Sequence, residues 1–217
     1  MKMKNFVPDD EYVKSTRYCD LESKEIIEFC SNYKNLSALD TIEEIFNFVR
    51  DTIKYRFDYP WRYASETLKK KTGNCFNKAN LQIALLRRCG IPAGYGVYLI
   101  KKEILKVLLP YDIFEMVNDP TIHVFAKVYI NNRWISLDAT VDKETYNTFY
   151  KKIGMWQRSN WDRKTHIQIE QEWVVEDQGL YSNIDLYLSQ LPRFWTDKLI
   201  ERANSFIEKN IISKMEG

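Results

Sequence analysis

The sequence predicts an α+β fold in which a helix that begins at a cysteine packs against an antiparallel sheet. Residues 75–89 carry apolar side chains at helical spacing, which is the clearest helical pattern in the chain. Residues 122–130 alternate between branched or small apolar side chains and other types, as a half-buried strand does. Asn131-Asn132 then forms a two-residue turn, and residues 133–138 return as a second antiparallel strand.

Ahead of the cysteine, the chain predicts an arm and two helices. Residues 1–20 are polar with little periodicity and are expected to form an extended arm, and residues 21–34 suggest a moderately amphipathic helix. A clearer helix follows, for which Asp40 is the predicted N-cap, with Glu43 three residues later. Its apolar positions keep helical spacing: Ile42, Ile45, Phe46, Val49 and Ile53.

The nucleophile helix has clear start and stop signals. Residues 55–74 fit no single period and are expected to be a loop with a short helix after Ser65. Asn74 is the predicted N-cap of the helix over 75–89, and Gly90 stands where a left-handed C-terminal cap is expected.

The remaining chain predicts strands at 93–100 and 104–109, and a further strand near 165–175 followed by polar helical stretches. The sequence shows no internal repeat, no low-complexity tract and no linker that would indicate a second domain. We therefore expect one domain over 1–217, with its core at about 41–142, an N-terminal helical arm and a C-terminal extension.

Composition excludes several classes of protein. Hydrophobic residues make up 45% of the 217 residues and charged residues 29%, which is typical of a globular chain and not of a disordered one. The net charge of +2 gives no reason to expect a nucleic-acid partner. We find no apolar run of about 18 residues and no apolar core of a signal peptide, so we expect no membrane span and a cytoplasmic location.

The four cysteines are Cys19, Cys30, Cys75 and Cys89. No pair has C-x-x-C spacing, and the chain has only two histidines, so a structural zinc site is not expected. In a chain without a secretion signal the thiols should be free.

Cys75 has the local setting of a reactive thiol. At the first position of a helix, unpaired N–H groups and the positive end of the helix dipole stabilise a thiolate. The N–H of Cys75 could also face a developing oxyanion. The ordinary alternative is a buried structural cysteine, which suits Cys30 and Cys89 on apolar helix stripes better than Cys75, which follows Thr-Gly-Asn.

His123 and Asp138 are predicted to lie on one face of the hairpin. A two-residue turn at 131–132 places Asp138 opposite Phe125, and His123 lies two residues from Phe125, diagonal to Asp138. Diagonal neighbours are about 7–8 Å apart at Cα, which allows a His–Asp hydrogen bond. A lone histidine on a strand is more often a surface or structural residue, but together with Cys75 these residues suit a nucleophile, a base and an orienting group.

Two segments resemble the transglutaminase-like, papain-related superfamily of cysteine enzymes. Residues 73–93, from Gly-Asn-Cys-Phe-Asn to Cys-Gly-Ile-Pro-Ala, resemble its nucleophile segment, and residues 123–140 resemble its histidine–aspartate hairpin. The resemblance implies a papain-like α+β fold and thioester chemistry on an amide. It makes Cys75 the nucleophile, His123 the acid and base, and Asp138 the residue that orients His123. Family members often have Trp at the position of Phe125 and Arg at that of Gly94.

The second oxyanion donor is often a side chain that precedes the nucleophile. Tyr55 is our first candidate, because similar domains carry a tyrosine near this distance, and Trp61 is the second. Tyr55 could equally be a packing residue. We expect Trp134 and Trp156 to pack, and residues 149–163 to form either a cleft wall or an aromatic outer layer. Nothing resembles the calcium-binding apparatus of animal transglutaminases, so neither a metal nor a cofactor is expected.

The leading hypothesis is a cysteine hydrolase or acyltransferase that acts on a peptide or amide substrate through an acyl-enzyme. The alternative is a non-catalytic peptide-binding module that keeps the fold. A third reading, an acetyltransferase with an acyl thioester donor, shares the same three residues but lacks a nucleotide-binding signature. The pattern leaves the substrate, the choice between hydrolysis and transfer, and the oligomeric state open.

Overall fold

A computed structural model describes residues 10–191 and 194–215 of the chain. The first nine residues of the predicted arm lie outside the described residues, and the described part of the arm begins with a 3₁₀ turn, η1 (Asp10–Val13). Within the described ranges, no helix is long and apolar enough to cross a membrane.

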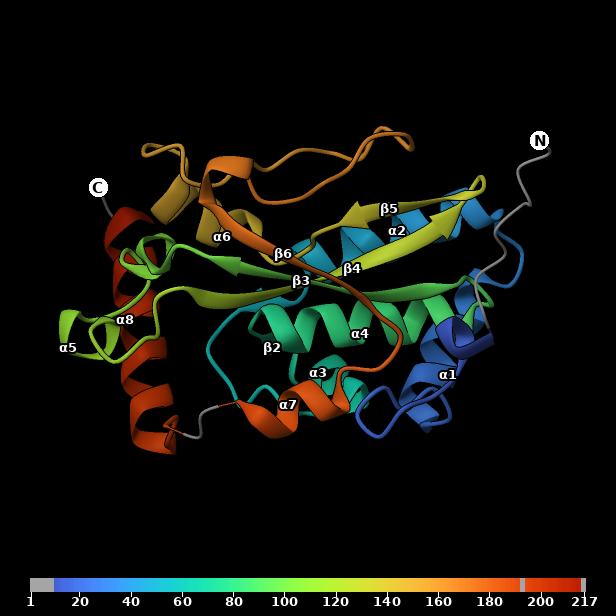
Figure 1. The fold of residues 1–217 in the computed structure, drawn as a ribbon, viewed down its shortest axis with the longest axis horizontal. Helices are drawn as coiled ribbons and strands as arrows, with labels where there is room; N and C mark the ends of the chain where they lie inside the picture. Colours follow the sequence, from blue (N-terminus) through green and yellow to red (C-terminus); the bar gives the residue numbers. More distant parts are fainter. Residues whose placement is uncertain (1–9, 192–193, 216–217) are drawn as a thin grey trace.

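A four-stranded antiparallel sheet runs through the middle of the molecule (Figure 1). Its strand order is β5-β4-β3-β6. The strands are β3 (Ala93–Ile100), β4 (Thr121–Ile130), β5 (Arg133–Leu137) and β6 (Val174–Tyr181). The α+β prediction is therefore confirmed, and so are the strands predicted at 93–100, 122–130 and 133–138.

The β4–β5 hairpin has the predicted register. Ile130 pairs with Arg133 and Ala126 pairs with Leu137. Asn131 and Asn132 have φ angles of 52° and 61°, the left-handed values that a tight two-residue hairpin turn requires. The turn length therefore fixes which side chains share a face of the sheet.

One face of the sheet packs against the nucleophile helix α4 (Cys75–Arg88). Helices α1 (Lys24–Cys30) and α2 (Ala38–Asp51) contact α4 and belong to the same core. The strand residues of this core are fully buried: Val97, Val124, Ala126, Val128, Ile135 and Leu137.

The start of α2 corrects one prediction. Ser37, not Asp40, is the N-cap: its hydroxyl oxygen accepts the Asp40 N–H at 3.2 Å. The hydroxyl in turn donates to the Asp40 carboxylate at 2.6 Å. Asp40 is therefore the third residue of the helix, where an acidic side chain interacts favourably with the helix dipole. The predicted capping pattern is present, but it begins three residues earlier than expected.

Part of the C-terminal extension covers the opposite face of the sheet. It contributes α6 (Lys143–Thr145), a π-type turn η4 (Tyr146–Tyr150) and α8 (Asp197–Met215), while α5 (Tyr111–Phe114) and α8 close one end of the molecule (Figure 1). The remaining short elements are η2 (Ser31–Tyr33), β1 (Lys54–Tyr55), α3 (Ala64–Lys70), β2 (Thr72–Gly73), η3 (Lys102–Leu105), η5 (Gln171–Trp173) and α7 (Asp185–Gln190).

Two strand predictions were wrong. Residues 104–109 form the end of η3 and a turn, with Ile104 and Leu108 buried four residues apart, which is a helical spacing. Residues 165–173 contain only a single bridge, at Ile167, and the turn η5. The strand itself is β6, further along the chain, which pairs with the edge of β3 through register shifts and leaves charged side chains exposed.

Candidate active site

The N-terminus of α4 places Cys75 beside β1. The Asn74 side chain caps the helix, and the Asn77 side chain returns a bond to the Asn74 N–H at 3.0 Å. The parallel bridge of β1 and β2 pairs Tyr55 with Gly73, two residues before the cysteine. A Cβ atom at Gly73 would lie 2.6 Å from the Asn77 Cβ, so the cap requires glycine there.

His123 and Asp138 meet as the hairpin register predicts. His123 Nε2 lies 2.7 Å from Asp138 Oδ2, and the exposed fractions of the two residues are only 3% and 4%. The other carboxylate oxygen, Oδ1, accepts the Thr140 N–H at 3.0 Å. This arrangement leaves Nδ1 of the imidazole available for the Cys75 thiol, with which the ring is in hydrogen-bond contact.

The charges around His123 favour its imidazolium form. Burial acts to lower the pKa of His123, but the Asp138 carboxylate, through its charge and its hydrogen bond, and the contact with Cys75 outweigh burial. The net effect raises the pKa of His123 to about 10. At neutral pH the ring is thus a proton donor held between a buried carboxylate and a thiol.

Two aromatic rings hold the imidazole in place. Phe125 stacks on His123 with centroids 5.8 Å apart, and Trp156 meets it edge-on at 5.3 Å. Tyr98 packs behind Phe125 at 4.7 Å. Trp156 therefore packs, as expected, and it also lines the cavity beside the histidine. Trp134 packs against Tyr12 and Tyr129, away from this cavity.

Tyr55 lines the cavity, whereas Trp61 does not. The Tyr55 N–H donates to Asp142 at 2.7 Å, which fixes the backbone of this residue. Burial, together with the nearby Cys75 and Tyr150, raises the pKa of Tyr55 well above its ordinary value, so its hydroxyl stays a neutral donor. The Trp61 ring instead stacks on Tyr59.

Lys78 lies one helical turn after Cys75 and is fully buried. Its ammonium donates to the carbonyl oxygens of Ile53 at 2.5 Å and Arg50 at 3.2 Å, at the C-terminal end of α2. Burial lowers the pKa of Lys78 to about 8, against the opposing charges of Asp142 and Asp138. Lys78 thus joins α4 to the end of α2, from which the chain continues to Tyr55.

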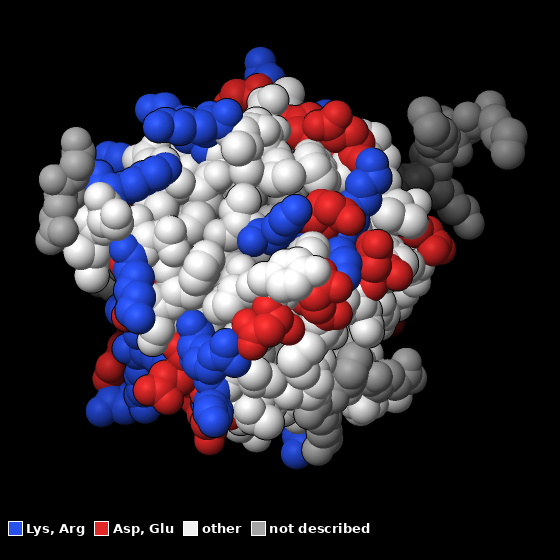
Figure 2. Space-filling model, turned by 90° about the vertical axis from the view of Figure 1, so that its left-hand side faces the viewer, with Lys and Arg blue, Asp and Glu red and all other residues white. Residues whose placement is uncertain are grey.

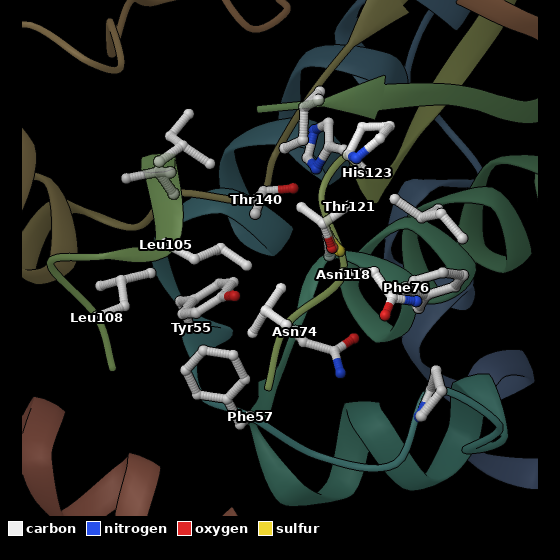
Figure 3. Close-up of a pocket in the computed structure, with 18 of the residues that line it drawn as sticks. Tyr55, Phe57, Asn74, Phe76, Leu105, Leu108, Asn118, Thr121, His123 and Thr140 are labelled. Atoms are coloured by element: carbon white, nitrogen blue, oxygen red, sulfur yellow. The ribbon is translucent and has the colours of Figure 1, made fainter. Parts of the chain in front are cut away.

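A cavity of about 150 Å³ adjoins Cys75 and His123. In Figure 3, Thr121 and Thr140 lie beside His123, while Leu105 and Leu108 stand on the side of the cavity that also carries Tyr55. Much of its wall comes from residues that had no predicted role: Ile104, Leu105, Leu108, Val117, Asn118, Thr140, Val141 and Trp195.

The other cysteines and His166 do not line this cavity. All four thiols are free. Nδ1 of His166 accepts the Ser136 N–H at 3.0 Å, and burial lowers the pKa of this histidine. Across residues 10–191 and 194–215, no group of three or more His, Cys, Asp or Glu side chains could hold a metal ion.

Sequence reasoning missed the residues that support the site. Thr140 and Asp142 follow Asp138 closely, and a short run of hydroxyl and carboxyl side chains after a strand is a signal for such turns. Asn204 reaches the site from the C-terminal extension, and no local pattern could place it there. Trp156 belongs to the segment 149–163, for which a cleft wall was one of two expectations, and it lines the cavity.

The fold and the site define an α+β protein in which a cysteine at a helix start faces a buried histidine–aspartate pair. A family model described as the transglutaminase-like superfamily matches residues 28–139, just over half of the chain, and the chain belongs to this superfamily. The match begins before the region 41–142 that the resemblance covered and ends one residue after Asp138.

A solved structure of a "putative cysteine protease" from Cytophaga hutchinsonii is 23% identical to this chain, with a TM-score of 0.45. The similarity covers 62% of this chain and 43% of that one, so the chain matches less than half of the other protein's length. A search of the curated proteins found no match.

Proposed function

We propose that the protein is a cysteine-dependent hydrolase or acyltransferase that acts on amide bonds through a thioester. One observation carries this proposal: the buried imidazole of His123 lies between the Asp138 carboxylate and the Cys75 thiol at the start of α4. Superfamily membership is consistent with such chemistry.

In the proposed reaction, the Cys75 thiolate attacks the amide carbon and a C–S bond forms. The N–H of Cys75 and the Tyr55 hydroxyl stabilise the oxyanion, because both are neutral donors at the cavity wall. The His123 imidazolium gives its proton to the amide nitrogen as the C–N bond breaks, and an amine leaves. Asp138 keeps the ring oriented throughout.

The neutral imidazole then takes a proton from the acceptor, which attacks the thioester and releases the Cys75 thiolate. Water as acceptor makes the protein a hydrolase, and an amine makes it an acyltransferase. Mass analysis of products formed with and without an added primary alkylamine distinguishes the two, because only an acyltransferase passes the acyl group to the amine in preference to water.

The test is to trap the acyl-enzyme. The intact protein is mixed with a panel of N-acetyl amino-acid thioesters and anilides, quenched in acid and analysed by peptide mass spectrometry. We expect an acyl group on Cys75 in the wild type and in the His166→Ala control, and none in Cys75→Ser. His123→Ala should slow both formation and turnover of the adduct by about 10²–10⁴-fold. Equal acylation of the wild type and His123→Ala would contradict the proposal.

A further inference from the structure

The cavity beside Cys75 is free of formal charge apart from His123. No Asp, Glu, Lys or Arg side chain lines it within the described part of the chain, although such residues make up 29% of the sequence. Figure 2 views the end of the molecule that carries α5 and α8, where an uncharged area is bordered by Lys and Arg along one side. A cationic substrate group would find no carboxylate on the cavity wall, and an anionic group would find only His123, whose ring is already paired with Asp138.

Three polar side chains lie on the side of the cavity that carries His123, and two leucines lie on another side. The polar side chains Asn118, Thr121 and Thr140 lie near His123, where an amide group would react (Figure 3). Leu105 and Leu108 stand on another side of the cavity (Figure 3). This separation suits a substrate whose amide lies at the polar side and whose side chain enters the apolar part.

The apolar wall is a fixed part of the fold. It comes from the connection between β3 and β4, where the exposed fractions of Ile104 and Leu108 are only 1% and 2%. The Tyr150 hydroxyl donates to the Ile104 carbonyl at 3.0 Å, which ties this connection to the C-terminal extension. Leu105, by contrast, is only half-buried, so its side chain can be replaced with less damage to the core.

The volume limits the size of the occupant. An apolar cavity of about 150 Å³ lined by Leu, Ile and Phe side chains stays dry and binds benzene. The cavity here has the same volume, about 150 Å³, so one branched or phenyl side chain fits. Transfer of an ionised group into such a cavity without a partner is strongly unfavourable.

We propose that the cavity binds one neutral apolar side chain of the substrate, of the size of leucine or phenylalanine, next to the amide that Cys75 attacks. Leu105 and Leu108 set this preference. The assignment of substrate class rests on the proposed thioester chemistry, but the binding of the side chain does not need turnover and is measured separately.

The first arm of the test uses acyloxymethyl ketones of N-acetyl amino acids that differ only in the side chain: Gly, Leu, Phe, Trp, Glu or Lys. The rate at which each labels Cys75 is measured by mass spectrometry. We expect the Leu and Phe probes to react at least about tenfold faster than the Gly, Glu and Lys probes, a ratio typical of one apolar pocket, and the Trp probe shows whether a larger ring is also accepted. Equal rates for all probes, or a preference for Glu or Lys, would overturn the inference and leave the proposed chemistry intact.

Two variants test whether Leu105 determines which substrate side chain the cavity prefers. Leu105→Glu should lower the rates of the Leu and Phe probes about tenfold and raise that of the Lys probe. The matched control is Leu186→Glu on α7, where the side chain is 73% exposed and does not line the cavity; its probe rates should equal those of the wild type. Unchanged selectivity in Leu105→Glu would contradict the assigned wall.

The second arm measures binding without chemistry. N-acetyl-leucine methylamide and its glutamate counterpart are titrated into Cys75→Ser and followed by NMR. The leucine compound should bind at least about tenfold more tightly, and Leu105→Glu in the same background should abolish the difference. If every ketone labels Cys75 no faster than Cys89, the thioester chemistry fails, and this arm alone decides whether the cavity binds apolar side chains.

Discussion

At the scale of single residues, the position of the His123 ring depends on a glycine in the neighbouring strand. Gly96 on β3 pairs with Phe125 on β4, and a Cβ at Gly96 would lie 2.5 Å from the tip of the Phe125 ring. Phe125 is 1% exposed and stacks on His123, so its ring cannot move without displacing the imidazole.

Gly96→Ala should therefore lower kcat by about a hundredfold, through a displacement of His123 of the order of 1 Å. Overpacking should also cost about 1–3 kcal/mol of unfolding free energy. Gly94→Ala is the control: its Cβ would crowd Leu180 at 2.8 Å and Tyr12 at 2.9 Å, away from Phe125, so a similar loss of stability should leave kcat unchanged. Chemical denaturation and steady-state kinetics give both quantities, and equal kcat losses would contradict this role of Gly96.

The residues that sequence patterns located are those whose positions follow from local rules. Once the two-residue turn at 131–132 is fixed, each residue of one strand has a defined partner on the other strand. This was enough to predict that His123 and Asp138 lie close together. The helix start at Cys75 followed from the Asn74 cap. Tyr55 could be proposed only from the resemblance, because its place beside Gly73 depends on a two-residue bridge with no pattern of its own.

At the scale of elements, α8 holds the loop that carries one wall of the site. The Asn204 side chain accepts the Phe57 N–H at 2.8 Å and donates to the Phe57 carbonyl at 2.9 Å. Phe57 lines the cavity and stacks on Trp195, which precedes α8. The end of the C-terminal extension, for which no role was predicted, thus supports one wall of the cavity.

Asn204→Ala should loosen this loop. The loss of two hydrogen bonds to a buried segment should cost about 1–3 kcal/mol of unfolding free energy and lower kcat/KM. Asn210 is the matched control, because it lies on the same helix and its side chain only donates to Phe206 of that helix. Asn210→Ala should change the unfolding free energy by no more than about 0.5 kcal/mol and should leave kcat/KM nearly unchanged. Identical effects of the two substitutions, measured by urea denaturation and kinetics, would contradict the proposed clamp.

The elements that were mispredicted share a physical cause. The connection between β3 and β4 forms short helical turns because Ile104 and Leu108 pack inward against the extension, a tertiary contact that local alternation does not reveal. Strand β6 is an edge strand with register shifts, so its side chains lack the alternation by which strands are recognised. Local patterns therefore located the hairpin and the nucleophile helix and missed the layer packed over them.

At the scale of the whole molecule, the sheet is covered on both faces, and the imidazole–carboxylate pair is buried beneath the second layer. A pair in this position links folding to pH. The pKa of His123 is raised from 6.5 to about 10 in the folded protein, with Asp138 the main stabilising charge. Its contribution to stability is fully present below about pH 6.5, the ordinary histidine value, and is lost as the pH rises through about 10.

Asp138→Asn keeps the size of the side chain and removes the charge. We expect the difference in unfolding free energy between wild type and Asp138→Asn to be largest, about 3 kcal/mol or more, near pH 6 and to shrink as the pH approaches 10. Urea denaturation at several pH values measures this difference. A difference that stays constant from about pH 6 to pH 10 would contradict the prediction, because it would mean that Asp138 does not raise the pKa of His123 in the folded protein.

The central claim is that the buried His123–Asp138 pair activates Cys75 as a nucleophile, and the rate of alkylation of each cysteine tests it most directly. Cys89 is the demanding comparison, since it is half-buried and a hydrogen bond from Cys30 lowers its pKa. Burial, in contrast, raises the pKa of Cys19 to about 11, and the hydrogen bond to Cys89, with burial, raises that of Cys30.

The intact protein is treated with iodoacetamide between about pH 5 and pH 9, and the rate at each cysteine is read by mass spectrometry. We predict that Cys75 reacts fastest of the four cysteines, because the His123 imidazolium beside it persists to high pH. His123→Ala should slow the reaction of Cys75 most strongly near pH 6. A Cys75 rate that is no higher than that of Cys89 and that is unchanged in His123→Ala would contradict the account and favour a binding module without catalysis.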